Sequence, residues 1–441
     1  MTDFLDYDPF SLAVQRDPYP YYAALREHAP VFHVDSSDAW AISRYADVHH
    51  VLEHPEVFSS RALQTFLAGG LLDNVNRGPL RLLSHPGMAG VARALGAVSR
   101  ALGRGTPLFE AVHSLLSSRA VISADPPDHT RLRHLVNRGF TPRRVAALEP
   151  RIREIARECL DAMETRDEMD LMRDFAVPLP VTVIAEVLGV PNDRLRDFKR
   201  WSDAIVQGVS LGGATKPPRA LIATMLEFMQ YLRELIDERR ARPADDLISV
   251  LVQEQEGGSL DFHELLLFLV VMLVAGNETT TNLIGNAIHL LLDRPEDLAA
   301  VEGDRSLVPG LVEESLRYVS PIQMLPRVAT RDAELAGTKI REGENLMVLF
   351  ASANRDSRKY PNGDAFELRR NPKEHVAFGF GIHYCLGASL ARLEGVVAFQ
   401  EIFARARNLR RAPGEVSFLA SGILRGPKTL PVAFDAPRVA A

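Results

Sequence analysis

The chain has 441 residues, of which 46% are hydrophobic and 24% charged, and its formal net charge is −6. This average composition argues against global disorder. The negative charge argues against nucleic-acid binding through bulk positive charge. Two cysteines can form neither a disulfide framework nor a four-cysteine zinc site. We therefore expect a reduced chain in which any functional cysteine acts singly.

The N-terminal residues 1–9 carry three aspartates and no basic residue, which is unlike a signal peptide. The longest apolar run, residues 265–276, is shorter than the roughly 20 residues that a membrane helix needs. We expect this run to form a buried helix in the core. We accordingly expect no membrane span, a cytoplasmic location and a monomer.

Helical periodicity dominates the chain, and the predicted fold class is mainly α with a minor β part in the C-terminal half. In chain order, we expect helices over residues 19–28, 45–54, 144–163, 175–188, 221–242, 261–293, 307–318 and 386–406. A brief strand is expected at 40–43. Small strands are expected within 328–344, and a hairpin over 419–434.

The two cysteines lie in different settings. Cys159 falls on the apolar face of the helix predicted at 144–163, where a small core residue is expected. Cys385 lies among Gly379, Gly381 and Gly387, directly before a long predicted helix. Glycines allow tight turns and close approach of the backbone to another group, and a helix N-terminus favours a thiolate. From these residues alone, the thiolate could be a nucleophile or an axial ligand to iron.

This segment resembles the haem-binding loop of the cytochrome P450 superfamily. Phe378, Gly381, Cys385 and Gly387 stand at the spacing of its Phe-x-x-Gly-x-x-x-Cys-x-Gly signature. The resemblance extends over essentially the whole chain. It implies a single domain, residues 1–441, with the cytochrome P450 fold and haem b between the long central helix and the cysteine loop. Cys385 is then the expected ligand to the haem iron.

Further segments resemble the same family in the same order. Glu314 and Arg317 match its Glu-x-x-Arg pair, which has a structural role. Taken alone, such a pair is more often a surface ion pair. Residues 275–280 resemble the oxygen-activating segment of the central helix. There Gly276 would leave room above the iron, Thr279 would supply a hydroxyl, and Glu278 would help to relay protons.

Four basic residues are expected to hold the haem propionates by the same resemblance. His129 and Arg133 show the family's His-x-x-x-Arg spacing. Arg327 follows the Glu-x-x-Arg helix, and His383 lies two residues before the cysteine. A guanidinium forked onto a carboxylate is a strong, charge-assisted hydrogen bond.

The implied function is that of a haem-thiolate monooxygenase, which inserts one atom of dioxygen into a hydrophobic small molecule by hydroxylation or epoxidation. Because the chain has no flavin, dinucleotide or iron–sulfur motif, we expect its electrons to come from a ferredoxin and its reductase. Arg138, Arg143 and Arg144 could form part of the docking face. The alternatives are a peroxide-driven or coupling haem-thiolate enzyme, and a non-catalytic haem protein that binds a ligand.

One segment departs from the family pattern. Residues 61–120 are longer than the corresponding loop of most members and contain apolar residues three and four apart, which predicts an amphipathic helix. Residues 61–118 hold six arginines, no lysine and two acidic residues. We interpret the segment as an extended lid for a bulky apolar substrate. A membrane-surface or partner patch and a surface elaboration without such a role are the alternatives.

Overall fold

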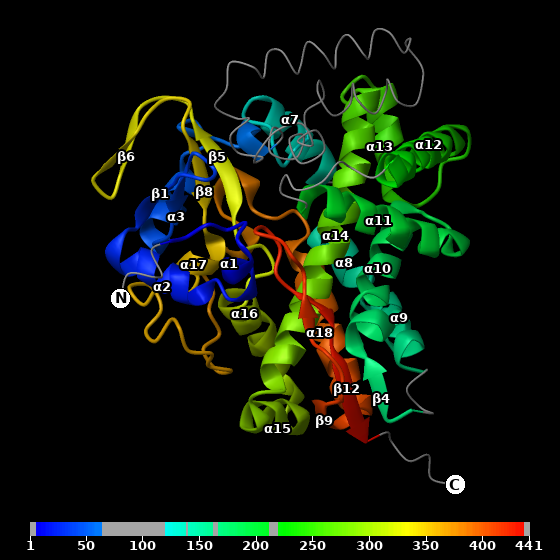
Figure 1. The fold of residues 1–441 in the computed structure, drawn as a ribbon. Coiled ribbons are helices and arrows are strands. Elements are labelled where there is room, and N and C mark those ends of the chain that lie inside the picture. The colour runs from blue at the N-terminus through cyan, green and yellow to red at the C-terminus, as the bar shows by residue number, and fades with distance from the viewer. Residues whose placement is uncertain (1–5, 64–119, 138–139, 162–165, 211–218, 436–441) are drawn as a thin grey trace.

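The computed structural model describes residues 6–63, 120–137, 140–161, 166–210 and 219–435. The predicted lid segment, residues 61–120, lies outside the described residues except at its two ends, 61–63 and 120, and so does its predicted amphipathic helix. Arg138 also lies outside them. Figure 1 shows a helical body crossed by the long helix α14, with the strands β1, β5, β6 and β8 on one side and β4, β9 and β12 near the C-terminus. The predicted class, mainly α with a minor β part, is confirmed.

Helices make up most of the described chain. The α-helices are α1 (Leu12–Arg16), α2 (Tyr19–His28), α3 (Tyr45–Glu53), α7 (Asp128–Asn137), α8 (Pro142–Ala147), α9 (Glu149–Asp161), α10 (Pro178–Leu188), α11 (Leu195–Ser210), α12 (Arg219–Ala241), α13 (Leu247–Glu256), α14 (Phe262–Leu291), α15 (Pro295–Gly303), α16 (Val308–Tyr318), α17 (Phe350–Ala353) and α18 (Ala388–Arg405).

Strands from both halves of the chain form the largest sheet, whose order is β1-β2-β8-β5-β3. Its strands are β1 (Val31–Val34), β2 (Ala39–Ile42), β3 (Phe58–Ser59), β5 (Leu325–Ala329) and β8 (Asn345–Val348). The sequence prediction placed the β part in the C-terminal half. Of β1, β2 and β3, it anticipated only β2, near residue 40. The short strand β3 pairs with the distant β5, so a tertiary contact decides its structure, whereas β1 forms a local hairpin with β2 that the sequence analysis did not identify.

The remaining strands form three small sheets. They are β4 (Glu168–Asp170), β6 (Ala333–Leu335), β7 (Thr338–Ile340), β9 (Arg407–Arg411), β10 (Ser417–Phe418), β11 (Pro427–Thr429) and β12 (Pro431–Asp435). The predicted C-terminal hairpin is formed by β10 and β11, whereas β12 pairs with β4 and β9 instead. The hairpin is therefore shorter than predicted.

The central helix α14 begins with a capping box, in which Asp261 accepts from the backbone N–H of Glu264 and Glu264 accepts from that of Asp261. It packs against α10, α16 and α18. Of the described helices, α14 alone is long and apolar enough to cross a membrane, and half of its most apolar window is buried. Its position inside the helical body agrees with the predicted core helix.

Prolines explain two differences between the predicted and observed helices. The helix predicted over 144–163 is divided into α8 and α9 around Leu148. Pro150 has no N–H with which to continue the helical hydrogen bonds from α8. The helix predicted over 175–188 begins as α10 at Pro178, after a π-helical turn at Met172–Ala176. Proline suits the first turn of a helix because its missing donor is not needed there.

Candidate functional site

The loop that carries Cys385 is held by backbone hydrogen bonds and left-handed glycines. The Cys385 N–H donates to the Phe378 carbonyl at 2.8 Å. Gly379 and Gly381 have φ of +71° and +67°, and a Cβ on Gly381 would come within 2.7 Å of the Leu52 carbonyl oxygen. Both positions need glycine because their φ angles are positive. Position 381 also needs it because the Leu52 carbonyl leaves no room for a Cβ. The loop delivers Cys385 just before α18.

The sulfur of Cys385 faces a large cavity, which we call the central cavity. Its empty volume, which includes space open to solvent, is about 1490 Å³, and it lies between the cysteine loop and α14. Apolar side chains form much of its wall: Leu52, Val121, Ile122, Phe140, Ile184, Phe268, Val271, Met272, Leu283, Leu316, Ile322, Leu325, Phe350, Leu386 and Leu390. A cavity of this kind suits a large apolar group with a few polar contacts.

The four basic residues predicted to bind carboxylates gather at this cavity. Arg133, Arg327 and His383 line it, and the ring of His129 lies 4.5 Å from that of His383, centroid to centroid. None of the described carboxylates forms an ion pair with either arginine. The Nε2 atoms of both histidines are buried without a hydrogen-bond partner. Buried cationic and polar groups without partners are costly, so this cluster suits an anionic ligand.

Burial and mutual repulsion change the pKa values of these groups. Burial lowers the pKa of Arg327 to about 10, although the nearby Asp125 raises it. Burial, together with Arg327, His129 and Arg133, lowers the pKa of His383 to about 3. Burial and Arg133 also lower the pKa of His129. Both imidazoles are therefore neutral at pH 7, and Arg133 and Arg327 supply the positive charge.

The protonation of Cys385 is governed mainly by burial, which raises the pKa of its thiol. The backbone N–H of Gly387 and the guanidiniums of Arg133 and Arg392 lower it. The backbone N–H at the start of α18 therefore favours the thiolate, as the sequence argument predicted. Burial nevertheless raises the pKa of Cys385 by more than this N–H lowers it. A bound metal cation would shift the balance towards the thiolate.

Thr279 lies on the cavity wall formed by α14, opposite the cysteine loop. Its hydroxyl donates to the Ala275 carbonyl at 2.7 Å, and Ala275, Gly276 and Thr280 also line the cavity. A Cβ added to Gly276 would lie 2.9 Å from Cγ1 of Ile184. The glycine is therefore also needed for the close packing of α10 on α14, a role that the sequence did not indicate.

Glu278 is not in the cavity wall. It is 7% exposed, and its Oε1 lies 3.8 Å from Nζ of Lys199 on α11. Lys199 also forms an ion pair with Asp203. Burial raises the pKa of Glu278, while Lys199 lowers it and Asp203 raises it further. The two residues predicted to act together, Glu278 and Thr279, thus project from α14 in different directions.

Glu314 and Arg317 form a fully buried ion pair, with a separation of 2.7 Å between Oε1 and Nη2. Arg317 also donates to the carbonyls of Asn354 and Gly363. Because these carbonyls belong to the segment that leads to the cysteine loop, the pair fixes that segment on α16. The surface ion pair considered from the sequence is therefore wrong, and the structural role implied by the resemblance fits the contacts.

Cys159 lies against the core cluster that contains α9 and α18. Burial and the neighbouring Glu158 and Asp161 raise its pKa to about 11. A thiol with this pKa is not a thiolate near neutral pH, which agrees with the predicted packing role.

Sequence reasoning missed Glu394 on α18. This carboxyl is 1% exposed and lines the central cavity, and its Oε2 has no hydrogen-bond partner. Burial raises its pKa to about 8, although contact with Thr280 lowers it in part. The signal was present: Glu394 lies four residues after Leu390 and three before Val397, on the buried face of the helix.

Comparisons with known proteins agree on one family. The family model described as "Cytochrome P450" matches residues 215–407. The chain is 37% identical to "Cytochrome P450 107B1" of Saccharopolyspora erythraea, with 98% of each chain covered. It resembles the structure of CYP109Q5 from Chondromyces apiculatus, with a TM-score of 0.80, 37% identity and 98% and 99% coverage. CYP109E1 from Bacillus megaterium, solved in complex with testosterone, gives a TM-score of 0.79, 33% identity and 97% and 100% coverage.

Proposed function

The chain belongs to the cytochrome P450 family of haem-thiolate monooxygenases, and we propose that it hydroxylates or epoxidises an apolar small molecule with electrons from a ferredoxin system. The observation that carries this proposal is the central cavity. Its floor holds Cys385, its opposite wall holds Thr279, and two arginines without carboxylate partners border it. The family carries protohaem, which when bound to a cysteine thiolate supplies the iron that activates dioxygen.

We propose that Cys385 ligates the haem iron and that four basic side chains hold the propionates. Arg133 and Arg327 would donate charge-assisted hydrogen bonds to the carboxylates. His129 and His383 would each donate an N–H from Nε2, and a carboxylate there would raise the pKa values that burial lowers in its absence. The orphaned Nε2 atoms of the histidines would gain partners in this way.

Protons are proposed to reach the cavity along α11 and α14. Asp203 and Lys199 are partly exposed, and Lys199 contacts Glu278. Glu278, whose pKa is raised by burial, can take up and release a proton nearer neutral pH than an exposed glutamate. Thr279, at the cavity wall, would hold the last hydroxyl of the route. Rotation of Glu278 or an intervening water would bridge the two side chains.

The proposed substrate is hydrophobic, because apolar side chains such as Phe268, Met272, Ile322 and Leu325 form much of the wall of the central cavity. Testosterone bound to the related CYP109E1 is an apolar molecule of this class. A screen of terpenoids, steroids, fatty acids and polyketides for a shift of the haem absorption band tests this proposal. If only charged compounds shifted the band, the apolar assignment would be wrong.

The proposed ferredoxin surface lies around α8 and the cysteine loop. Arg143 and Arg144 are exposed on α8, which packs against α18. Phe380 and Tyr384 of the cysteine loop are 37% and 38% exposed, so an apolar contact is available there. An acidic ferredoxin would be steered by the arginines and packed against the aromatic rings.

Two measurements test the proposed function. The reduced protein with carbon monoxide should give the thiolate spectrum, and an imidazole-type spectrum would contradict the assignment of Cys385. Turnover of a bound apolar compound should then be faster with a ferredoxin and its reductase than with hydrogen peroxide. Faster turnover with peroxide would favour the peroxide-driven alternative. Arg143→Gln/Arg144→Gln should slow reduction by ferredoxin at low salt, whereas the distant, exposed Arg410→Gln should not.

A further inference from the structure

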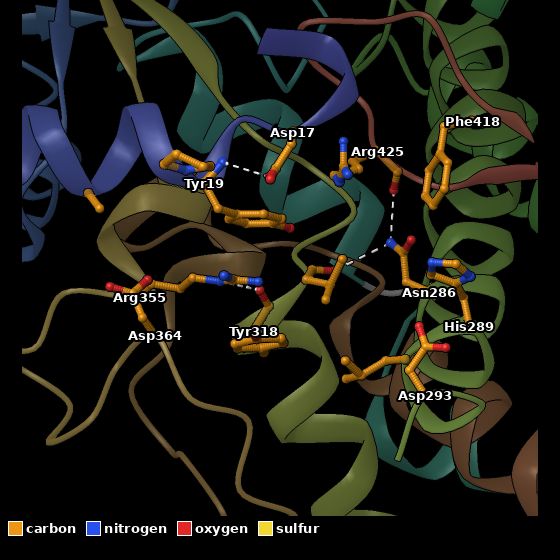
Figure 2. A pocket seen from close by; sticks show the side chains of 14 residues that line it. Asp17, Tyr19, Asn286, His289, Asp293, Tyr318, Arg355, Asp364, Phe418 and Arg425 are labelled. Atoms are coloured by element: carbon orange, nitrogen blue, oxygen red, sulfur yellow. Dashed lines mark hydrogen bonds between the residues drawn. The ribbon is translucent and has the colours of Figure 1, made fainter. Parts of the chain in front are cut away.

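A second cavity opens at the junction of α2, α14, α16 and the β10–β11 hairpin (Figure 2). Its empty volume, which includes space open to solvent, is about 1030 Å³, and it shares no lining residue with the central cavity. The ring of Tyr19 enters it from the α2 side, and Asn286 and His289 enter it from α14. The proposed monooxygenase chemistry uses none of these residues.

A buried acceptor in this cavity lacks a partner. Asn286 is 2% exposed, and its Nδ2 donates to the carbonyls of Val319 and Arg425 at 3.4 and 2.9 Å. These two bonds fix the orientation of the amide, so Oδ1 is the free acceptor, and it has no hydrogen-bond partner in the described chain. The hydroxyl of Tyr19, on the opposite wall, is also buried without a partner. Buried polar groups are normally hydrogen-bonded, which indicates a missing donor.

The same cavity holds two guanidiniums without a carboxylate partner in the described chain. Arg355 is 5% exposed and lies between the rings of Tyr19 and Tyr318, 3.4 and 3.6 Å from their centroids. Its Nε donates to the Tyr318 carbonyl. Arg425 donates to the backbone carbonyls of residues 15 and 16. Neutral carbonyls do not cancel the charge of either arginine.

The carboxylates of the cavity compensate this positive charge only in part, because Asp364 acts on Arg355 through its charge without forming an ion pair with it. Asp364 pairs with Arg26, and Asp293 pairs with Arg411, at 2.8 and 2.7 Å. Neither of those arginines lines the cavity. Asp17 is the remaining carboxylate, and it accepts the backbone N–H of Tyr19. Among the described residues, two cations without an ion pair thus face one carboxylate without an ion pair, and the local field favours a ligand with a single negative charge.

Apolar and aromatic side chains complete the walls. The ring of Phe418 meets that of His289 edge-on at 5.2 Å between centroids, and Leu290 and Val319 also line the cavity. Flat surfaces of this kind suit an aromatic body. We propose that the second cavity binds a small aromatic carboxylate bearing a hydroxyl group, with the carboxylate at Arg355 and Arg425 and the hydroxyl donating to Oδ1 of Asn286.

The test uses the haem-loaded enzyme with 4-phenylimidazole bound to the iron, so that the central cavity is blocked. Binding of 4-hydroxybenzoate is then measured by saturation-transfer NMR and calorimetry. Benzoate lacks the hydroxyl, and tyramine replaces the negative charge with a positive one. We expect both to bind at least tenfold more weakly than 4-hydroxybenzoate. Equal or tighter binding of either compound would overturn the assigned chemistry.

Variants locate the binding. Arg425→Gln should weaken 4-hydroxybenzoate binding by about tenfold or more, and Leu290→Trp, which fills the cavity, should abolish it. Arg410→Gln, which removes an exposed arginine elsewhere, should leave the affinity unchanged. The haem spectrum and thermal unfolding of each variant report whether it is folded. No binding to the wild type, binding retained in Leu290→Trp, or displacement of 4-hydroxybenzoate by 4-phenylimidazole would each overturn the proposal.

Discussion

Glu278 and Thr279 are adjacent in sequence, yet Thr279 lines the central cavity whereas Glu278 contacts Lys199 on α11. Successive residues of an α-helix differ by about 100° in direction, so neighbours in sequence reach different surroundings. One residue can therefore receive protons from the α11 side, and the other can present a hydroxyl to the cavity.

The first prediction concerns this pair. Glu278→Gln keeps the shape of the side chain but removes its ionisable carboxyl group, so substrate oxidation should slow by about a hundredfold. Thr279→Ala should lower the ratio of product formed to dioxygen consumed, because the cavity loses its hydroxyl. Asn277→Ala removes a neighbouring polar group that contacts Ser202, and it should change this ratio little. Unchanged rates and ratios in the first two variants would contradict the proposed route.

The two cysteines should respond differently to substitution. Cys385→Ser should abolish the thiolate spectrum of the reduced protein with carbon monoxide. Cys159→Ala should retain that spectrum and cost a modest amount of stability, about 1 kcal/mol, because a partly buried sulfur is lost from the core. A thiolate spectrum in Cys385→Ser would contradict the ligand assignment.

Haem retention should depend on Arg327. Arg327→Gln removes a buried charge proposed to bind a propionate, and a hydrogen bond to a charged group contributes about 1.5–3 kcal/mol. Haem transfer to an excess of apomyoglobin should therefore accelerate by about tenfold or more. Arg331→Gln, a substitution of a nearby exposed arginine, is the matched control and should transfer haem at the wild-type rate.

The buried pair of Glu314 and Arg317 should be expensive to break. Arg317→Met leaves the buried carboxylate of Glu314 with only the longer ion pair to Arg370, at 3.3 Å, and the free energy of unfolding should fall by about 3–5 kcal/mol. The exposed pair of Arg410 and Asp435 provides the contrast, because breaking it should cost about 0–1 kcal/mol. Denaturant unfolding of Arg317→Met and of a variant that breaks the exposed pair measures the difference. Similar losses of unfolding free energy in the two would contradict the structural role of Glu314 and Arg317.

Glu394 should make stability depend on pH. Burial raises its pKa to about 8 in the folded state, above the ordinary value of 4.5. Between these two pH values the folded state keeps a proton that the unfolded state releases, so stability should decrease as pH rises through this window. Glu394→Gln stays uncharged and should lose much of this decrease. Melting temperatures at pH 5 and pH 8 test the effect.

The control for this prediction is Glu415→Gln, since residue 415 is exposed. That variant should follow the wild type at both pH values. If Glu394→Gln also followed the wild type, the buried carboxyl would not be the group responsible.

The sequence predicted the helices whose own pattern is strong. The bounds of α2 were predicted exactly as observed, and α14 and α18 were predicted to within about two residues, because apolar periodicity and capping are local properties. The short strand β3 was missed because its partner β5 lies far away in the chain, and β1 was missed although it forms a local hairpin with β2. The break between α8 and α9 was missed although Pro150 marks it.

The residues proposed for the site were also named from sequence, since motif spacing identified Cys385 and the four basic residues. Their neutral or charged states, the direction of Glu278, and the burial of Glu314 depend on which elements pack around them. Glu394 and the second cavity arise from contacts between segments far apart in the chain, such as Thr280 of α14 with Glu394 of α18, and Tyr19 of α2 with Arg425. The sequence by itself therefore determined the family, the residue types of the site and the strongly periodic helices. The tertiary structure alone decided which of those groups lose their water and their partners, because burial is a property of the packed fold.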